Sequence, residues 1–268
     1  MEAEQLLAHT LDVERIQLYL NPDRPLDQKE LDEFRPLIKK RKSGHPLQYI
    51  TGQTSFMGLP LKVDERTLIP RPETEELTEE ILSQFRGEKD LDILDLGTGS
   101  GAIAIALARF LVEPKITAVD KSPEALELAR ENAKDNDLLS EITFKQSDWF
   151  AGIEGKYDLI VSNPPYVATG EIAELKEEIK EHEPLKALDG GEEGLKEIKN
   201  ILSEAGRHLN EERGTIFLEI GHDQGEEVKR FAASQELEEV SLLTDTRGKD
   251  RIIQGRKGKS HVENCSNS

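Results

Sequence analysis

A glycine-rich segment at residues 95–101 sets the strongest limit on how this chain can fold. It follows the apolar stretch 92–96, which has the composition of a buried strand, and it leads into an apolar stretch with helical character. Gly97, Gly99 and Gly101 allow the backbone to turn sharply between strand and helix and to approach a ligand closely. The segment therefore predicts a ligand-binding loop at the carboxyl end of a strand in an α/β sheet.

Strand-like and helix-like stretches alternate from this segment onward. Helices are expected at 100–111, 123–133 and 226–233, and strands at 92–96, 115–119, 142–146, 157–161, 215–220, 240–244 and 251–255. Ser122 followed by Pro123 marks a helix start, because serine accepts an otherwise unpaired N–H and proline has none. Such alternation predicts an α/β fold with a doubly wound, mostly parallel sheet of seven strands.

The first part of the chain has a different pattern. Leucines at helical spacing occur on both sides of Pro22 and Pro25, which predicts a small helical domain at residues 1–46. Looser alternation follows, and we assign residues 47–72 to a hairpin linker. The sheet domain then covers residues 73–260, and a polar tail occupies residues 261–268.

The distribution of charge limits the class of partner. The chain has 54 acidic and 35 basic residues and a net charge of −19. Residues 1–70 contain 10 basic and 11 acidic side chains, which leaves 25 basic and 43 acidic ones in residues 71–268. Because this excess opposes attraction to phosphate backbones, we expect no direct DNA binding. The basic run 39–42 either contacts RNA or an acidic partner, or only complements a helix dipole.

The sequence indicates a protein of a reducing compartment that does not span a membrane. Cys265 is the only cysteine, which excludes an intramolecular disulfide and a thiolate metal cluster. His182 and His222 lack the spacing of metal ligands, so no metal is expected. The first 20 residues contain four acidic side chains, unlike a signal peptide, and no apolar run reaches membrane-spanning length. We expect a cytoplasmic monomer.

The glycine spacing points to a nucleoside cofactor other than NAD. The loop reads G-x-G-x-G, whereas dinucleotide-binding loops read G-x-G-x-x-G. Asp120 ends the next strand, 23 positions after Gly97, where a carboxylate can accept both ribose hydroxyls. The loop resembles the first motif of the class I S-adenosylmethionine-dependent methyltransferases, in which it faces the amino-acid part of the cofactor. This implies S-adenosylmethionine contacts at Gly97, Thr98, Gly99, Ser100, Gly101 and Asp120.

Asp148 and Trp149 follow the third strand, where folds of this class contact the adenine. Trp149 can stack on the adenine ring, but a single tryptophan is often a core residue, and both interpretations remain open. The alternative for the loop itself is a glycine-rich turn with an aspartate that caps a helix.

Asn163-Pro164-Pro165-Tyr166 follows the fourth strand. The prolines fix the backbone and lack N–H groups, which leaves carbonyl acceptors at the edge of the sheet. A planar NH₂ group could donate to the Asn163 side chain and the Pro164 carbonyl while Tyr166 packs on its plane. An amide nitrogen is a weak nucleophile, and positioning can supply up to about 7–11 kcal/mol. We predict that these four residues bind the substrate and act in catalysis, with Asn163 also beside the cofactor; an ordinary turn is the alternative.

Together these motifs resemble the class I amino-methyltransferases, which include adenine-N6 DNA enzymes, guanine-N2 ribosomal RNA enzymes and glutamine enzymes. Five further segments are similar to the release factor glutamine methyltransferases: GHPLQYITG (44–52), LIPRPETE (68–75), EHEP (181–184), ALDGGEEGL (187–195) and TRGKDR (246–251). The resemblance covers nearly the whole chain.

The resemblance implies a substrate and a partner. The substrate is the glutamine in the Gly-Gly-Gln loop of class 1 peptide chain release factors, and the helical domain helps to bind that factor. A nucleic-acid amino-methyltransferase, acting on adenine-N6 or guanine-N2, is the nearest alternative, but it would need a basic groove. A protein that binds S-adenosylmethionine or a nucleotide without catalysis is the alternative of a different class.

Overall fold

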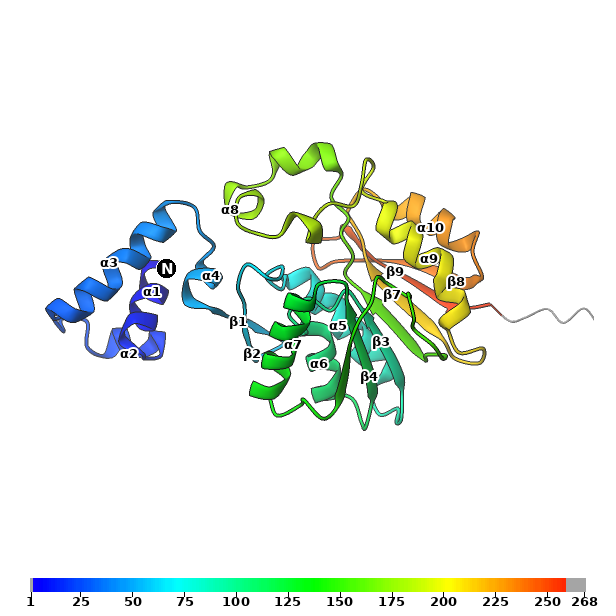
Figure 1. Cartoon of the computed structure of the whole chain (residues 1–268), viewed down its shortest axis with the longest axis horizontal. Coiled ribbons are helices and arrows are strands. Elements are labelled where there is room, and N and C mark those ends of the chain that lie inside the picture. Colours follow the sequence, from blue (N-terminus) through cyan, green and yellow to red (C-terminus); the bar gives the residue numbers. More distant parts are fainter. Residues whose placement is uncertain (1, 259–268) are drawn as a thin grey trace, which may run out of the picture.

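Seven strands form one sheet in the computed structural model, which describes residues 2–258 (Figure 1). The sheet order is β5-β4-β3-β6-β7-β9-β8, in which β9 is antiparallel to both of its neighbours and the other pairs are parallel. The strands are β3 (Asp92–Leu96), β4 (Lys115–Asp120), β5 (Ile142–Gln146), β6 (Leu159–Ser162), β7 (Thr215–Glu219), β8 (Leu237–Thr244) and β9 (Asp250–Lys257). The prediction of a mostly parallel, seven-stranded sheet is confirmed.

Helices cover both faces of the sheet. One face carries α5 (Pro72–Phe85), α6 (Ala102–Phe110) and α7 (Pro123–Asp135), and the other carries α9 (Lys196–His208) and α10 (Gly225–Ala233). The central strand β3 packs against the helices on both faces. Ile93 packs with α5 and α6, whereas Leu94 and Leu96 pack with α9 and α10. This two-sided burial is typical of parallel strands.

The register of β3 against β6 places two loops next to each other. Leu96 lies opposite Ser162, and the Ser162 hydroxyl donates a 2.6 Å hydrogen bond to the Leu96 carbonyl. The sheet continues with β4 and β5 on the β3 side of this pair and with β7 on the β6 side. Ligands bind at such a switch point, at the carboxyl ends of the strands. Gly97 and Asn163, the next residue of each segment, both leave the sheet there.

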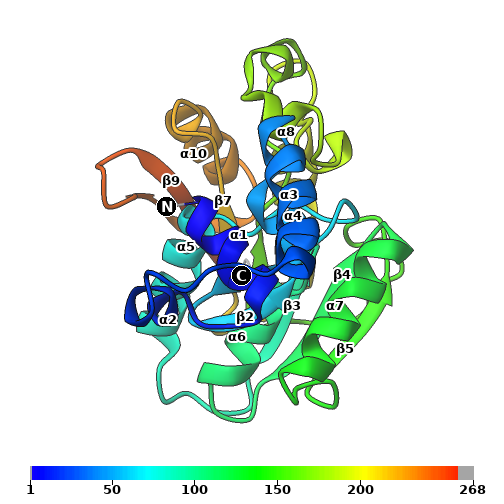
Figure 2. The ribbon, with the colours of Figure 1, turned by 90° about the vertical axis from the view of Figure 1, so that its left-hand side faces the viewer.

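A helical lobe projects from the sheet domain at the amino end (Figure 1). It contains α1 (Glu2–Leu11), α2 (Arg15–Leu20) and α3 (Gln28–Lys42). The basic run at 39–42 forms the last turn of α3, and Arg41 makes ion pairs with Glu2 and with Glu178, at 2.8 and 2.9 Å. Figure 2, viewed from the side of the lobe, shows α3 close to α8 (Glu177–Lys180), which carries Glu178.

The linker begins with a short helix rather than a strand. Residues 47–72 were predicted as a hairpin, but α4 (Leu47–Thr51) precedes the two strands β1 (Gln53–Phe56) and β2 (Leu59–Lys62). Gly52 ends α4 with a left-handed φ of 71°, which turns the chain into β1.

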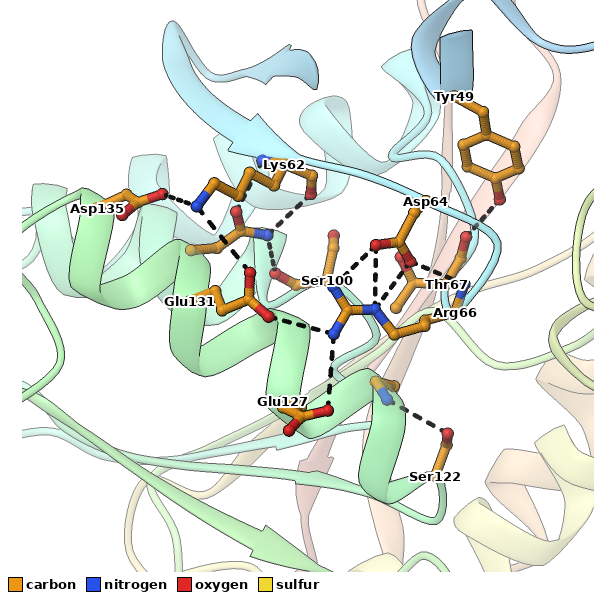
Figure 3. A network of polar contacts seen from close by, with 12 residues as sticks. Tyr49, Lys62, Asp64, Arg66, Thr67, Ser100, Ser122, Glu127, Glu131 and Asp135 are labelled. Atoms are coloured by element: carbon orange, nitrogen blue, oxygen red, sulfur yellow. Dashed lines mark hydrogen bonds and ion pairs between the residues drawn. The ribbon is translucent and has the colours of Figure 1, made fainter. Parts of the chain in front are cut away.

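Asn132 of α7 attaches the hairpin to the sheet domain. Its side chain is fully buried, accepts from the Lys62 N–H at 2.7 Å and donates to the Lys62 and Ser100 carbonyls at 3.0 and 2.9 Å. Nearby, Arg66 of the linker pairs with Asp64 and Glu131 (Figure 3). One helix therefore holds both the linker and the glycine-rich loop.

Several predicted boundaries differ from the structure, and β8, for example, begins at Leu237 instead of residue 240. β6 begins at Leu159 instead of residue 157, because Tyr157 makes only an isolated bridge with Leu209. α6 begins at Ala102 instead of residue 100, because Gly101 has a left-handed φ of 83°.

Helical segments also differ from the prediction. The helices α5 and α9 were not predicted. The acidic stretch 171–183 is divided between the 3₁₀ turn Thr169–Glu174 and α8, because the extended backbone of Leu175 interrupts it. The tail expected at 261–268 lies outside the described residues, and among residues 2–258 no helix is long and apolar enough to cross a membrane.

The Asn132 contacts generate a stability prediction. Asn132→Ala leaves the Lys62 N–H and two carbonyls without their partner, so the free energy of unfolding should fall by about 2–3 kcal/mol. Asn200→Ala, an exposed asparagine on α9, is the matched control and should change it by less than about 0.5 kcal/mol. Urea unfolding followed by circular dichroism measures both. Equal stability of the two variants would contradict the attachment role of Asn132.

Candidate active site

The glycine-rich loop adopts a conformation that requires its glycines. Gly97, Gly99 and Gly101 have φ values of 71°, 55° and 83°, which side chains strongly disfavour. A Cβ atom at Gly97 would also lie 3.2 Å from the Trp149 ring. The Thr98 N–H donates to the Val119 carbonyl at 2.9 Å, which holds the loop against β4.

Asp95 is a buried acidic group at the start of this loop. Its side chain is fully buried, and one carboxylate oxygen accepts from the Thr98 hydroxyl at 2.6 Å. Burial raises the pKa of Asp95 to about 7, although the Thr98 hydrogen bond opposes this shift. The other oxygen, Oδ1, has no hydrogen-bond partner within residues 2–258. Oδ1 is therefore a buried acceptor at the start of the loop, where the backbone N–H of Ala104 also acts to lower the pKa of Asp95.

Asp120 lies at the carboxyl end of β4, as predicted. Its two oxygens accept hydrogen bonds from the backbone N–H groups of Gly99 and Ser122, both at 2.9 Å. Each carboxylate oxygen can accept a second donor, so both remain able to bind hydroxyl groups. The carboxylate thus joins the glycine-rich loop to the start of α7.

The two residues expected near an adenine have different environments. Asp148 is exposed and forms a 2.7 Å ion pair with Lys121. Trp149 is partly buried against the core formed with α9 and donates its ring N–H to Glu197 at 2.7 Å. It also lies against Gly97, so it is both a packing residue and part of the wall beside the loop.

The tetrapeptide is held by a buried polar network. The Asn163 side-chain NH₂ donates to the Thr74 hydroxyl at 2.9 Å, and the Thr74 hydroxyl donates to Glu219 at 2.7 Å. The Tyr166 hydroxyl donates to the other Glu219 oxygen at 3.0 Å. Glu219 is fully buried at the end of β7, and burial raises its pKa.

The backbone of the tetrapeptide packs against two glycines of the segment 187–195. A Cβ atom at Gly190 would lie 2.8 Å from the Pro165 carbonyl oxygen, and one at Gly194 would lie 2.3 Å from that of Tyr166. The Val167 N–H and carbonyl pair with this segment at 3.0 and 2.8 Å. The glycines are therefore required by the close approach of two backbone segments.

Thr74 and Glu219 are site residues that the sequence did not indicate. The acidic residues on either side of Thr74 make contacts elsewhere, because Glu75 accepts from the Met57 N–H in the hairpin and Glu73 lies 3.9 Å from Arg247. The residue between them, Thr74, is the one that reaches Asn163. Its position in the LIPRPETE segment was the only signal available.

An open cavity of about 550 Å³ lies beside the Asp120 end of the site. Tyr49 and Arg66 of the linker, Ser122 and Glu124 at the start of α7, and Lys186 line it. Figure 3 shows Tyr49, Arg66 and Ser122 around this region. Within residues 2–258, no group of three or more His, Cys, Asp or Glu side chains is arranged to hold a metal ion.

Comparison with solved structures supports the fold. A methyltransferase from Pyrococcus furiosus is similar with a TM-score of 0.57 and 22% identity, over 85% of this chain and 98% of that protein. A 16S rRNA N2 methyltransferase from T. thermophilus is similar with a TM-score of 0.55 and 16% identity, over 76% of this chain and 49% of that protein. Both show that the sheet domain has the class I methyltransferase fold.

Comparison with sequence families is more specific. Residues 73–192 match the methyltransferase small domain, and residues 1–52 match the PrmC N-terminal domain. The release factor glutamine methyltransferase of Thermodesulfovibrio yellowstonii is 38% identical over 97% of this chain and 93% of its own length. That of Streptococcus pneumoniae is 45% identical over 84% of this chain and 80% of its own length. The chain belongs to the release factor glutamine methyltransferase family.

Proposed function

We propose that this protein methylates the side-chain amide nitrogen of the glutamine in the Gly-Gly-Gln loop of class 1 peptide chain release factors, with S-adenosylmethionine as the methyl donor. The observation that carries the proposal is the register of β3 and β6, which brings the glycine-rich loop and the Asn163 tetrapeptide together at one edge of the sheet. A methyl donor and its acceptor need this proximity.

The residues of the cofactor loop fit this donor. S-Adenosylmethionine supplies an electrophilic methyl group on a sulfonium centre. Asp120 keeps acceptor capacity on both oxygens for the ribose hydroxyls, and Oδ1 of Asp95 is a buried acceptor beside the loop. In the proposal Gly97–Gly101 face the amino-acid part, and Trp149 and Asp148 lie at the adenine.

The tetrapeptide residues orient the acceptor nitrogen. The lone pair of an amide nitrogen is delocalised into the carbonyl, so the enzyme must hold the nitrogen in line with the reacting methyl group. Asn163 Oδ1 and the Pro164 carbonyl accept the two N–H bonds of the substrate amide, and the Tyr166 ring packs on its plane. Holding the amide in this way supplies much of the rate, up to about 7–11 kcal/mol in favourable systems.

The proposal assigns recognition of the release factor to the helical lobe at residues 1–46. Residues 47–72 form the linker and residues 73–260 the catalytic domain, of which 259–260 lie outside the described residues. On α2 the apolar side chains of Ile16, Tyr19 and Leu20 are 67%, 56% and 71% exposed, which suits a protein partner. A cytoplasmic monomer that does not bind DNA completes the proposal, consistent with the net charge of −19.

One prediction of the proposed function concerns cofactor affinity. Asp120→Ala removes two charge-assisted hydrogen bonds to the ribose, so the dissociation constant of S-adenosylmethionine should rise about 10²-fold or more. Isothermal titration calorimetry measures the affinity, and circular dichroism tests whether the variant is folded. Asp23→Ala changes an exposed aspartate of the helical lobe and serves as the control. A folded Asp120→Ala protein with unchanged affinity would remove Asp120 from the cofactor site.

The second prediction concerns turnover. Asn163→Ala removes the acceptor that orients the substrate amide, so kcat should fall roughly 10²-fold or more. Single-turnover methylation of a release factor by labelled cofactor measures the chemical step, with Asn200→Ala as the control. If kcat stays normal and only KM rises, Asn163 contributes to binding alone.

The third prediction decides the substrate class. A release factor with an intact Gly-Gly-Gln loop should be methylated, whereas a Gly-Gly-Ala version should not. Duplex DNA should not be methylated at physiological salt, because residues 71–268 carry 43 acidic and 25 basic residues and base flipping requires several cationic contacts. Mass spectrometry locates the methyl group. Labelling of the Gly-Gly-Ala protein would contradict the glutamine assignment, and efficient labelling of DNA would favour a nucleic-acid enzyme.

A further inference from the structure

A continuous chain of hydrogen bonds connects Asn163 to a carboxylate that is out of reach of the substrate. The Asn163 NH₂ donates to Thr74, and Thr74 donates to Oε2 of Glu219. The three residues come from the end of β6, the first turn of α5 and the end of β7. Thr74 is 4% exposed and Glu219 is fully buried, so water does not compete for these contacts.

The chemistry of these groups gives the chain a direction. Both oxygens of Glu219 accept from hydroxyl groups, one from Tyr166 and one from Thr74, so Thr74 uses its single hydroxyl hydrogen on Glu219. The Thr74 oxygen can then only accept from Asn163, which obliges Asn163 to turn its NH₂ group toward Thr74. Oδ1 of Asn163 accepts no hydrogen bond within residues 2–258 and remains available as an acceptor.

We propose that Glu219 is a positioning residue which, through Thr74, orients the Asn163 amide so that its oxygen and not its NH₂ meets the substrate. The inference deepens the proposed function and rests on it, since the acceptor must match the NH₂ of a glutamine. With the opposite orientation, Asn163 would present hydrogens to the substrate NH₂ and would favour a carboxylate instead. Glu219 thereby selects glutamine over glutamate.

The same carboxylate holds the second substrate-facing side chain. Oε1 of Glu219 accepts from the Tyr166 hydroxyl at 3.0 Å, which fixes the ring of the tetrapeptide. Arg251 of β9 and Glu73 of α5 are the charged groups whose fields act on Glu219. Arg251, which is paired with Asp245 at 3.5 Å, lowers the pKa of Glu219 and so opposes the larger rise that burial causes.

Thr74→Val tests the hydrogen-bond chain from Asn163 to Glu219, because it removes the hydroxyl while it keeps the side-chain volume and the net charge. The Asn163 amide then loses its directional partner. We expect kcat on a Gly-Gly-Gln release factor to fall about 10- to 100-fold. Preference for a Gly-Gly-Gln over a Gly-Gly-Glu factor, measured as a ratio of dissociation constants, should fall at least about tenfold. Calorimetry with S-adenosylhomocysteine, which has no methyl group to transfer, measures this ratio.

Three further variants make the test specific. Thr74→Ser keeps the hydroxyl and should restore most of the turnover and preference lost in Thr74→Val. Thr78→Val is the matched control: Thr78 is buried one turn later on α5, and its hydroxyl donates to the Thr74 carbonyl at 2.9 Å and to no other group in the described part of the chain. Glu219→Gln should reduce kcat as Thr74→Val does, because an NH₂ group replaces one of the two carboxylate oxygens and one hydroxyl then faces a donor instead of an acceptor. It also removes a charge, so the preference ratio is judged on the Thr74 variants.

The outcomes separate this inference from the proposed function. If the unaltered protein does not methylate a Gly-Gly-Gln factor, the proposed function fails and the inference fails with it. If the unaltered protein methylates the factor and Thr74→Val retains the full preference for glutamine over glutamate, only the inference is overturned. Thr74→Ala, which also lacks the hydroxyl, replaces Thr74→Val if thermal melting shows that the valine variant does not fold.

Discussion

The parallel pairing of β3 with β6 is the constraint on which the rest of this structure depends. Because Leu96 lies opposite Ser162, the glycine-rich loop and the tetrapeptide begin at the same level of neighbouring strands. The sheet extends in opposite directions from this pair, so the two loops diverge and leave a site between them. A shift of one residue in this register would exchange the buried faces of β6 and displace Asn163.

The site contains acidic groups that the fold buries at a cost to stability. Glu219 has two hydroxyl donors, whereas Asp95 has one donor and an unpaired oxygen. A buried polar group without a partner typically destabilises a protein by about 1–3 kcal/mol. Functional sites are where folds keep such groups, because a ligand or an ordered network uses them. In the proposal a cofactor satisfies Asp95, and Glu219 orders the substrate-binding side chains.

Polar contacts attach the helical lobe and the linker to the sheet domain, and the hairpin also places Phe56 and Leu61 in the apolar core formed with α5 and α6. Asn132 ties the hairpin to α7, Arg66 adds ion pairs to the same helix, and Arg41 joins α3 to α8. Directional contacts of this kind help to define the position of the lobe relative to the active site. The lobe is nearly neutral, whereas the sheet domain is strongly acidic, which divides protein recognition from catalysis in the proposed function.

The sequence by itself determined the sheet domain, the glycine-rich loop and the tetrapeptide, because local patterns encode strands, helices and backbone turns. The predicted boundaries were less accurate, because the left-handed Gly101 moves the start of α6 to Ala102 and Tyr157 makes only an isolated bridge before β6. Only the tertiary structure decided how Asn163 is oriented. Thr74 and Glu219 are 145 residues apart, and neither has a local pattern that would pair it with the other. Their contact exists because α5 packs beside the end of β7, and no periodicity in the chain records that packing.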